Sequence, residues 1–208
     1  MQHFIFDFDG TISDSYPMFV KIGKQIIAEN QADNPYEDSE LYRLFKESTK
    51  TVFRAITWKN DFGAADFSKR FSELQEEYAF DFKPFPEAVH LLKTLKAQGK
   101  NLYLYTHTGT AIYAILEAMG LGGIFDFIID ASMPFPRKPA PDALLFLLEK
   151  CRLDPKDCLM IGDRPIDVEA GNNAGMKGCL WDADDLFGDC KADYKVRDLA
   201  ELEAIFLQ

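Results

Sequence analysis

Short apolar runs alternate with stretches of helical periodicity along most of the chain. Five runs are rich in β-forming residues and too short to be helices, so each predicts a buried strand. They cover residues 3–6, 101–105, 125–129, 158–161 and 177–181. Strands that alternate with helices indicate a parallel sheet with right-handed crossovers and helices on both faces. We expect the first run at the centre of this sheet, because apolar residues flank it on both sides.

The segments between the strands show the spacing of amphipathic helices. Helices are predicted at residues 86–98 and 143–150 and through Ile112 and Met119, and a capping box at 198–201 opens the last one. Residues 14 to about 80 contain no convincing strand. Four groups of apolar residues there have helical spacing: Phe19, Ile22, Ile26 and Ile27; Leu41, Leu44 and Phe45; Val52, Phe53 and Ile56; Phe67, Phe71, Leu74 and Tyr78. They predict a helical bundle inserted after the first strand, with the aromatic residues in its core.

Composition limits the classes of partner. The chain has 208 residues, 47% of them hydrophobic, and 18 phenylalanines, so it can bury a large core. A formal net charge of −11 argues against nucleic acid and against an anionic membrane surface. An acidic protein that acts on an anionic substrate needs cations at its site, either a metal ion or a few well-placed Lys and Arg residues.

The cysteines and the N-terminus bear on location. The four cysteines, Cys151, Cys158, Cys179 and Cys190, form neither a C-x-x-C pair nor a His-Cys cluster, so we expect mostly buried, reduced thiols. The sequence shows no signal segment, and no apolar run approaches the roughly 20 residues of a membrane span. These features predict a cytoplasmic protein.

Two acidic residues follow the first strand directly. Asp7 and Asp9 lie two positions apart on an extended chain, so their carboxylates project to the same side at the end of the strand. Gly10 permits a sharp turn, and Thr11 adds a hydroxyl group. The pair suggests a hard-metal site, a nucleophile with an acid/base partner, or both. The alternative is a loop in which Asp7 caps a turn.

Three further groups of polar residues follow later strands at the same sheet edge. Thr106-His107 offers a hydroxyl and backbone N–H groups for an anion, although Thr106 could simply cap the next helix. Arg137-Lys138 lies in a proline-stiffened loop, where a fixed lysine can neutralise a phosphate and screen nearby aspartates. A lone lysine is more often a solvated surface charge.

The third group is acidic. Asp163 follows Gly162 at the end of the fourth strand, and Asp167 comes four residues later. Either could cap a helix. Together with Asp7 and Asp9, however, they form the oxygen-rich set that Mg²⁺ prefers.

These four groups, in this order, resemble the motifs of the haloacid dehalogenase-like superfamily of phosphohydrolases, in its phosphoglycolate phosphatase-like branch. Residues 7–11 match the first motif, Thr106 the second, Lys138 the third, and Gly162-Asp163 with Asp167 the fourth. The resemblance covers the whole chain. It implies an α/β fold with a Rossmann-like parallel sheet core, residues 1–13 and 82–208, and an inserted α-helical cap domain, residues 14–81.

The resemblance also implies a mechanism. Asp7 would be the nucleophile that becomes an aspartyl-phosphate, and Asp9 the general acid and base. Mg²⁺ would be held by the Asp7 carboxylate, the Asp9 backbone carbonyl and Asp163, with Asp167 steadying the metal shell or Lys138 from outside. The predicted phosphate-binding residues are Gly10, Thr11, Thr106, His107 and Lys138. The substrate would be a small phosphorylated metabolite, and the enzyme a monomer or weak homodimer.

Three positions depart from the usual family pattern: Ser13, His107 and Arg164-Pro165. We hypothesise that His107 contacts the leaving group. Asp9 argues against a haloacid dehalogenase, because displacing halide needs no proton, and no single lysine of residues 14–81 stands out as the amine of a phosphonatase. A phosphosugar mutase, resembling β-phosphoglucomutase, and a non-catalytic binding or regulatory protein stay open.

Overall fold

The computed structural model describes residues 1–58 and 61–207 of the chain. The chain divides into two compact units. One combines Met1–Ser13 with Pro84–Gln208, and the other comprises Asp14–Lys83. The first unit therefore receives a long insertion directly after the loop that carries Asp7 and Asp9.

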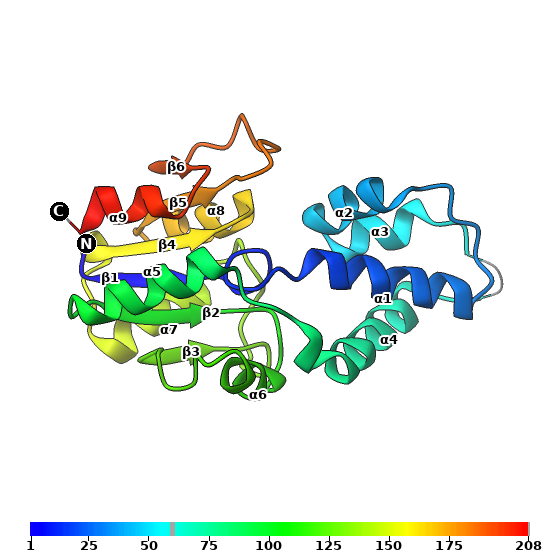
Figure 1. The fold of residues 1–208 in the computed structure, drawn as a ribbon, viewed down its shortest axis with the longest axis horizontal. Coiled ribbons are helices and arrows are strands. Elements are labelled where there is room, and N and C mark those ends of the chain that lie inside the picture. The colour runs from blue at the N-terminus through cyan, green and yellow to red at the C-terminus, as the bar shows by residue number, and fades with distance from the viewer. Residues whose placement is uncertain (59–60, 208) are drawn as a thin grey trace. The chain divides into compact units, whose positions relative to one another are not determined.

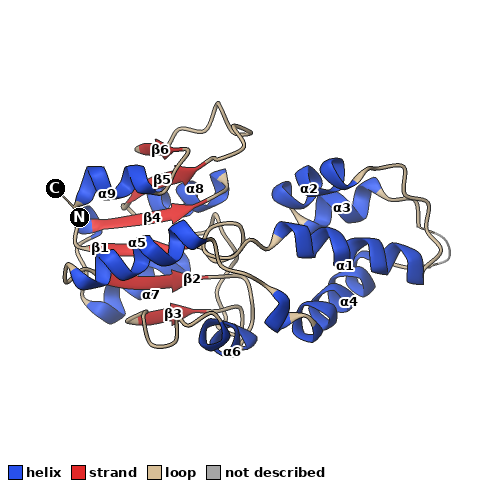
Figure 2. Ribbon diagram, in the orientation of Figure 1, coloured by secondary structure: helices blue, strands red, loops and turns tan. Residues whose placement is uncertain are grey.

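The first unit is built on a parallel sheet with the strand order β3-β2-β1-β4-β5-β6 (Figure 2). Its strands are β1 (His3–Phe6), β2 (Asn101–Tyr105), β3 (Phe127–Ile129), β4 (Cys158–Gly162), β5 (Lys177–Trp181) and β6 (Tyr194–Val196). The central strand β1 pairs with β2 and β4, and His3 lies opposite Asn101 and Cys158. The predicted α/β class, with the first strand at the centre of the sheet, is confirmed. In a sheet of this order the crevice between the carboxyl ends of β1 and β4 is the usual ligand site.

Three details of the sheet differ from the prediction, the smallest being that β4 extends one residue further, to Gly162. Strand β3 begins at Phe127 and not at residue 125, because the Asp126 side chain turns back to accept a hydrogen bond from the backbone N–H of Leu102 at 2.8 Å. Strand β6 was not predicted. It has three residues with an exposed Lys195 in the middle, too few for a recognisable pattern, and forms by pairing with β5 at the sheet edge.

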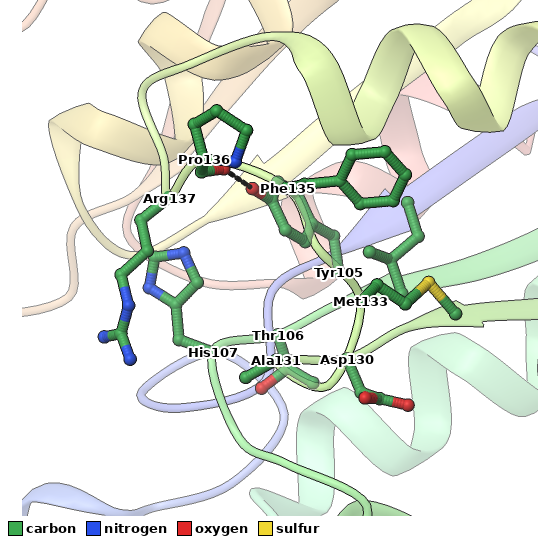
Figure 3. Close-up of a pocket in the computed structure, with 10 residues that line it drawn as sticks. Tyr105, Thr106, His107, Asp130, Ala131, Met133, Phe135, Pro136 and Arg137 are labelled. Atoms are coloured by element: carbon green, nitrogen blue, oxygen red, sulfur yellow. Dashed lines mark hydrogen bonds between the residues drawn. The ribbon is translucent and has the colours of Figure 1, made fainter.

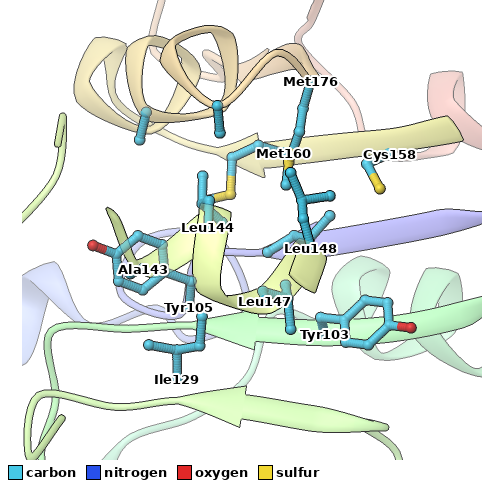
Figure 4. Close-up of a cluster of buried hydrophobic side chains, with 13 residues drawn as sticks. Tyr103, Tyr105, Ile129, Ala143, Leu144, Leu147, Leu148, Cys158, Met160 and Met176 are labelled. Carbon is cyan, nitrogen blue, oxygen red and sulfur yellow. The ribbon is translucent and has the colours of Figure 1, made fainter. Parts of the chain in front are cut away.

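Helices cover both faces of the sheet (Figure 1). They are α5 (Pro86–Ala97), α6 (Ala111–Ala118), α7 (Asp142–Cys151), α8 (Pro165–Asn173) and α9 (Ala200–Phe206). On one face, Leu144 and Leu147 of α7 pack against Ile5, Tyr103 and Met160 from three neighbouring strands (Figure 4). The alternate residues point to the other face, where the ring of Phe4 contacts Phe206 of α9 at 5.6 Å between centroids. Burial on both faces explains why the strands read as continuous apolar runs.

The second unit is helical, with no strand among its described residues (Figure 1). Its elements are α1 (Tyr16–Glu29), α2 (Asp38–Glu47), α3 (Thr49–Ala55), α4 (Ala64–Glu77) and a short 3₁₀ turn, Ala79–Asp81. The buried rings of Phe19, Phe45, Phe67 and Phe71 form its core, and those of Phe19 and Phe71 lie 5.3 Å apart. The aromatic stripes predicted as a core therefore serve that purpose.

All four cysteines carry free thiols, with Cys158 and Cys179 buried and the other two half-buried. Across residues 1–58 and 61–207, every helix is too short or too polar to cross a lipid bilayer.

Candidate active site

Polar residues gather at the carboxyl ends of β1, β2 and β4. Asp7 follows the last residue of β1, Thr106 follows β2, and Asp163 follows Gly162 of β4. Each is almost completely buried, with 1–2% of its surface exposed. The backbone continues the sheet pairing here, since the N–H of Asp7 donates to the carbonyl of Ile161 at 2.8 Å and that of Thr106 to Ile129 at 2.9 Å. The sheet itself thus fixes where these side chains begin.

Lys138 connects two of the aspartates. Its ammonium donates to Oδ1 of Asp7 at 2.6 Å and to Oδ1 of Asp167 at 2.8 Å. The Lys138 and Asp167 side chains are fully buried, and that of Asp7 is 3% exposed. Lys138 comes from the loop before α7, and Asp167 from the first turn of α8. Residues from three distant parts of the sequence thus share one buried cluster of charges.

Burial and charge act in opposite directions on this cluster. Burial alone would lower the pKa of Lys138, but the carboxylates of Asp167 and Asp7 outweigh it and raise that pKa above its ordinary value. Lys138 therefore keeps its positive charge. Burial raises the pKa of Asp167, and the nearby Asp7 carboxylate adds to the rise, while Lys138 opposes it. The cluster is stable only while its negative charges are balanced.

The same cluster offers ligands for a metal ion. One carboxylate oxygen each of Asp7, Asp163 and Asp167 can be chosen so that the three lie within 4.8 Å of one another. Asp7 Oδ2 is buried and has no hydrogen-bond partner among the described residues, although its other oxygen is held by Lys138. A buried carboxylate oxygen without a partner is costly unless a cation or a ligand completes it. Three buried carboxylates beside one lysine therefore fit a hard divalent ion such as Mg²⁺.

Gly162 lets Asp167 approach the end of β4. A methyl group at Gly162 would overlap the side chain of Asp167, with the carboxylate oxygen Oδ2 only 2.5 Å away. That oxygen accepts the backbone N–H of Arg164 at 3.2 Å, so the carboxylate is held at the start of α8 as well as by Lys138. A glycine is needed at this strand end for its small size.

We expect Gly162→Ala to displace Asp167 and lower kcat/KM by about 10–100-fold, because displaced carboxylates no longer hold Lys138 in place. Overpacking of this kind also lowers the free energy of unfolding by about 1–3 kcal/mol. Steady-state kinetics and thermal unfolding measure the two effects. Gly188→Ala is the matched control, because nothing lies within 4 Å of a methyl group there. Equal activity of the two variants would show that the position of Asp167 does not matter.

Asp9 is not one of the three carboxylates that can meet within 4.8 Å. Its side chain is half-buried, and its Oδ2 accepts a hydrogen bond from the hydroxyl of Thr108 at 3.2 Å. Gly10 has a φ of 79°, which a residue with a side chain rarely adopts, and its N–H donates to the carbonyl of Ser13. The hydroxyl of Thr11 is buried without a hydrogen-bond partner in the described part of the chain. The hydrogen bond from Thr108 thus orients the Asp9 carboxylate, and the tight turn that follows buries Thr11.

Thr106 and His107 line a small pocket at the carboxyl ends of β2 and β3 (Figure 3). Its volume is about 60 Å³, and its other walls include Tyr105, Phe135 and Arg137. Thr106 Oγ1 accepts the N–H of Thr108 at 3.0 Å, and His107 Nε2 accepts the backbone N–H of Lys138 at 3.3 Å. Burial lowers the pKa of His107 to about 3, and the cations of Lys138, Arg137 and Arg164 add to the effect. The ring is therefore neutral at physiological pH.

The structure brings together most residues that the sequence singled out. Asp7, Lys138, Asp163 and Asp167 form one cluster, and His107 touches the backbone of Lys138. Two partners did not emerge from the sequence. Thr108, two positions after Thr106, holds Asp9, and the ring of Tyr105 lies beneath the Lys138 ammonium at 4.6 Å from its centroid. The sequence predicted Tyr105 only as a strand residue, and no local pattern indicated its contact with the Lys138 ammonium.

Comparison with known proteins agrees with this arrangement. The sequence profile of the haloacid dehalogenase-like hydrolases matches residues 4–180. A phosphoglycolate phosphatase of Aquifex aeolicus is 28% identical over 206 residues, which cover 95% of this chain and 91% of that protein. Another, from Psychrobacter arcticus, is 29% identical over 84% of this chain and 80% of its own.

Solved structures share the fold. A predicted phosphoglycolate phosphatase from Haemophilus somnus superposes with a TM-score of 0.84 at 22% identity, over 99% of this chain and 97% of that one. CbbY from Rhodobacter sphaeroides, crystallised with phosphate, has a TM-score of 0.77 at 21% identity, covering 97% and 96% of the two chains. Since the family profile matches most of the chain and the motif residues meet at one sheet edge, this protein belongs to the haloacid dehalogenase-like hydrolases.

Proposed function

We propose that this protein is a Mg²⁺-dependent phosphatase that hydrolyses a small phosphorylated metabolite through an aspartyl-phosphate. The buried group of Asp7, Asp163, Asp167 and Lys138 carries the proposal, because it combines a carboxylate nucleophile with the cations and metal ligands that a phosphate requires. Relatives named phosphoglycolate phosphatase support a phosphatase that acts on a small phosphate ester.

Asp7 is the proposed nucleophile. One of its carboxylate oxygens attacks phosphorus in line, the Asp7–phosphorus bond forms, and the bond between phosphorus and the ester oxygen breaks. Oδ1 is held by Lys138, and Oδ2 has no partner in the described part of the chain, so the carboxylate is oriented and still has an oxygen to offer. Burial at the end of β1 also keeps bulk water away from this group.

Asp9 is the proposed proton donor and acceptor. It gives its proton to the departing alcohol oxygen, and then takes a proton from the water that attacks the aspartyl-phosphate, which releases inorganic phosphate and restores Asp7. The half-buried side chain of Asp9 and its hydrogen bond from Thr108 are consistent with a group that meets both substrate and water.

The remaining residues would bind the phosphate and the ion. Lys138, Thr106, the N–H of His107 and the turn at Gly10 and Thr11 are proposed to hold the phosphate oxygens. Bound Mg²⁺, held by Asp7, the Asp9 carbonyl and Asp163, would orient the phosphate and reduce its repulsion from Asp7. Asp167, which contacts Lys138 at 2.8 Å, would steady that lysine.

The helical unit, Asp14–Lys83, is proposed to act as a cap that excludes water and selects the leaving group. Its insertion directly after the Asp9 turn supports this role, and its limits are close to the cap range of 14–81 expected from the sequence. We further propose a cytoplasmic enzyme that works as a monomer or weak homodimer. Its four free thiols suit a reducing compartment.

Phosphate release from a panel of phosphorylated metabolites, with Mg²⁺ present, tests the function. The panel should include phosphoglycolate and hexose phosphates. Release of inorganic phosphate without an isomeric sugar phosphate supports the phosphatase, whereas an isomer without free phosphate would identify a mutase. Inactivity against every ester would favour a non-catalytic protein.

Mg²⁺ is expected to stabilise the protein against unfolding, because it neutralises carboxylates that are buried together only in the folded state. At 100 times its dissociation constant, a ligand that binds only the folded state adds about 2.7 kcal/mol. Thermal unfolding with Mg²⁺ and with EDTA measures this shift. Asp163→Asn should reduce it, while Asp189→Asn at an exposed position should leave it intact. An equal shift in both variants would place the ion elsewhere.

A further inference from the structure

The loop that carries Lys138 is held by two nearby residues, Tyr105 at the last position of β2 and His107 two positions later. His107 Nε2 accepts the backbone N–H of Lys138 at 3.3 Å. The hydroxyl of Tyr105 donates to the carbonyl of Pro136 at 3.5 Å, as the dashed line in Figure 3 shows. The rings of Tyr105 and His107 meet edge to face, with centroids 5.9 Å apart. Tyr105 and His107 thus contact the loop on both sides of Arg137.

Tyr105 also contacts the lysine head group. The Lys138 ammonium lies 4.6 Å from the centroid of the Tyr105 ring, while it donates to Asp7 and Asp167. A ring face close to a buried ammonium attracts it without competing for its protons. The ring therefore adds a further contact to the head group, besides those to the two carboxylates.

The charge state of His107 suits an acceptor. Burial and three neighbouring cations hold the pKa of His107 at about 3, so Nε2 keeps its lone pair for the N–H of Lys138. A protonated ring could not accept this hydrogen bond. The geometry and the surrounding charges therefore favour the same neutral form.

We infer that Tyr105 and His107 are positioning residues, which act on the reaction by fixing the loop and the ammonium group of Lys138. This role differs from the contact with the leaving group that the sequence suggested for His107, since the ring nitrogen is directed to the protein's own backbone. The inference rests on the proposed part of Lys138 in phosphate binding.

Paired substitutions test the role of His107. His107→Leu removes the acceptor and keeps much of the bulk, and we expect kcat/KM to fall by about 10–100-fold because Lys138 shifts. His107→Gln retains an acceptor in a similar place and should stay within about threefold of the wild type. If Gln is as damaging as Leu, the ring itself meets the substrate and the inference is wrong.

A double-mutant cycle separates positioning from direct contact. In a Lys138→Met background, His107→Leu should change the residual kcat/KM by less than about twofold, because the group that it positions is gone. The same fold-loss in both backgrounds would mean that His107 acts independently of Lys138. Tyr105→Phe, which keeps the ring face, should lower kcat/KM less than Tyr105→Leu in the same assay. Equal losses would show that the ring face of Tyr105 does not position Lys138.

A measurement that needs no substrate tests the role of His107 independently of the proposed phosphatase activity. ¹⁵N NMR of histidine-labelled protein should show His107 neutral, protonated on Nδ1, down to about pH 5. His107→Leu identifies the signal among the three histidines. A ring that carries its proton on Nε2, or that titrates near its ordinary pKa of about 6.5, would overturn the inference whether or not a substrate is known.

Discussion

Asp7→Asn is expected to abolish turnover, with a loss of about 10⁴-fold or more in kcat. An amide oxygen is too weak a nucleophile to form the phosphoryl intermediate, and removing a nucleophile costs an enzyme roughly this much. The variant also loses the charge that Lys138 contacts at 2.6 Å, but Lys138 keeps Asp167 as a partner, so the fold should persist. Phosphate release and circular dichroism together separate the loss of chemistry from a loss of structure.

Beryllium fluoride gives this experiment a direct readout. It mimics a phosphoryl group on a carboxylate, so wild-type protein with Mg²⁺ should show a bound signal by ¹⁹F NMR that Asp7→Asn lacks. Asp189→Asn, at an exposed position, serves as the control and should behave as the wild type. A bound signal that survives in Asp7→Asn would assign the nucleophile to another residue.

The residues at the strand ends are the part of this site that is most readily predicted from the sequence. Asp7, Thr106 and Asp163 each follow an apolar run, and parallel strands bring their carboxyl ends to one edge, so a local pattern is enough to predict their neighbourhood. The same logic predicted the parallel sheet and its central strand. Strand β6 was not predicted, because three residues with an exposed lysine show no periodicity of their own.

Contacts made by loops could not be predicted from the sequence in this way. Whether Lys138 would reach Asp7, Asp167 or both depends on the path of the loop before α7, and neither Thr108 at Asp9 nor Tyr105 beneath Lys138 has a signature in the sequence. Gly162 could be read as a simple turn residue, but its small size is what lets Asp167 into the cluster. Such roles come from packing between distant segments, which residue spacing does not encode.

The buried charges also show why this cluster suits phosphoryl transfer. Lys138, together with Arg164 at 4.0 Å from Asp163, balances only part of the charge of three carboxylates, so the folded protein retains an excess of negative charge in a place that water hardly reaches. A divalent cation corrects this excess, and the dianionic phosphate group then brings charge that the lysine and the ion can share. Acidic residues can therefore build a site for an anion in a protein whose net charge is −11.

Lys138→Met should therefore damage both stability and activity. It leaves Asp7 and Asp167 buried without their shared cation, and removing one partner of a buried ion pair costs about 3–5 kcal/mol of unfolding free energy. For a protein of this size that corresponds to a fall in Tm of about 6–20 °C. We also expect kcat/KM to fall by at least about 100-fold, since a charge that stabilises the transferred phosphoryl group is lost. Thermal unfolding and steady-state kinetics measure the two losses.

A second substitution separates the two effects. In Lys138→Met with Asp167→Asn, one of the two facing carboxylates becomes neutral, so much of the lost stability should return while the activity stays low. Lys156→Met, at an exposed position, controls for the change of side chain and should leave both unchanged. If the double variant is no more stable than Lys138→Met, repulsion between the buried carboxylates does not explain the loss. If its activity recovers, the lysine acts only by screening the aspartates and makes no necessary contact with the phosphate.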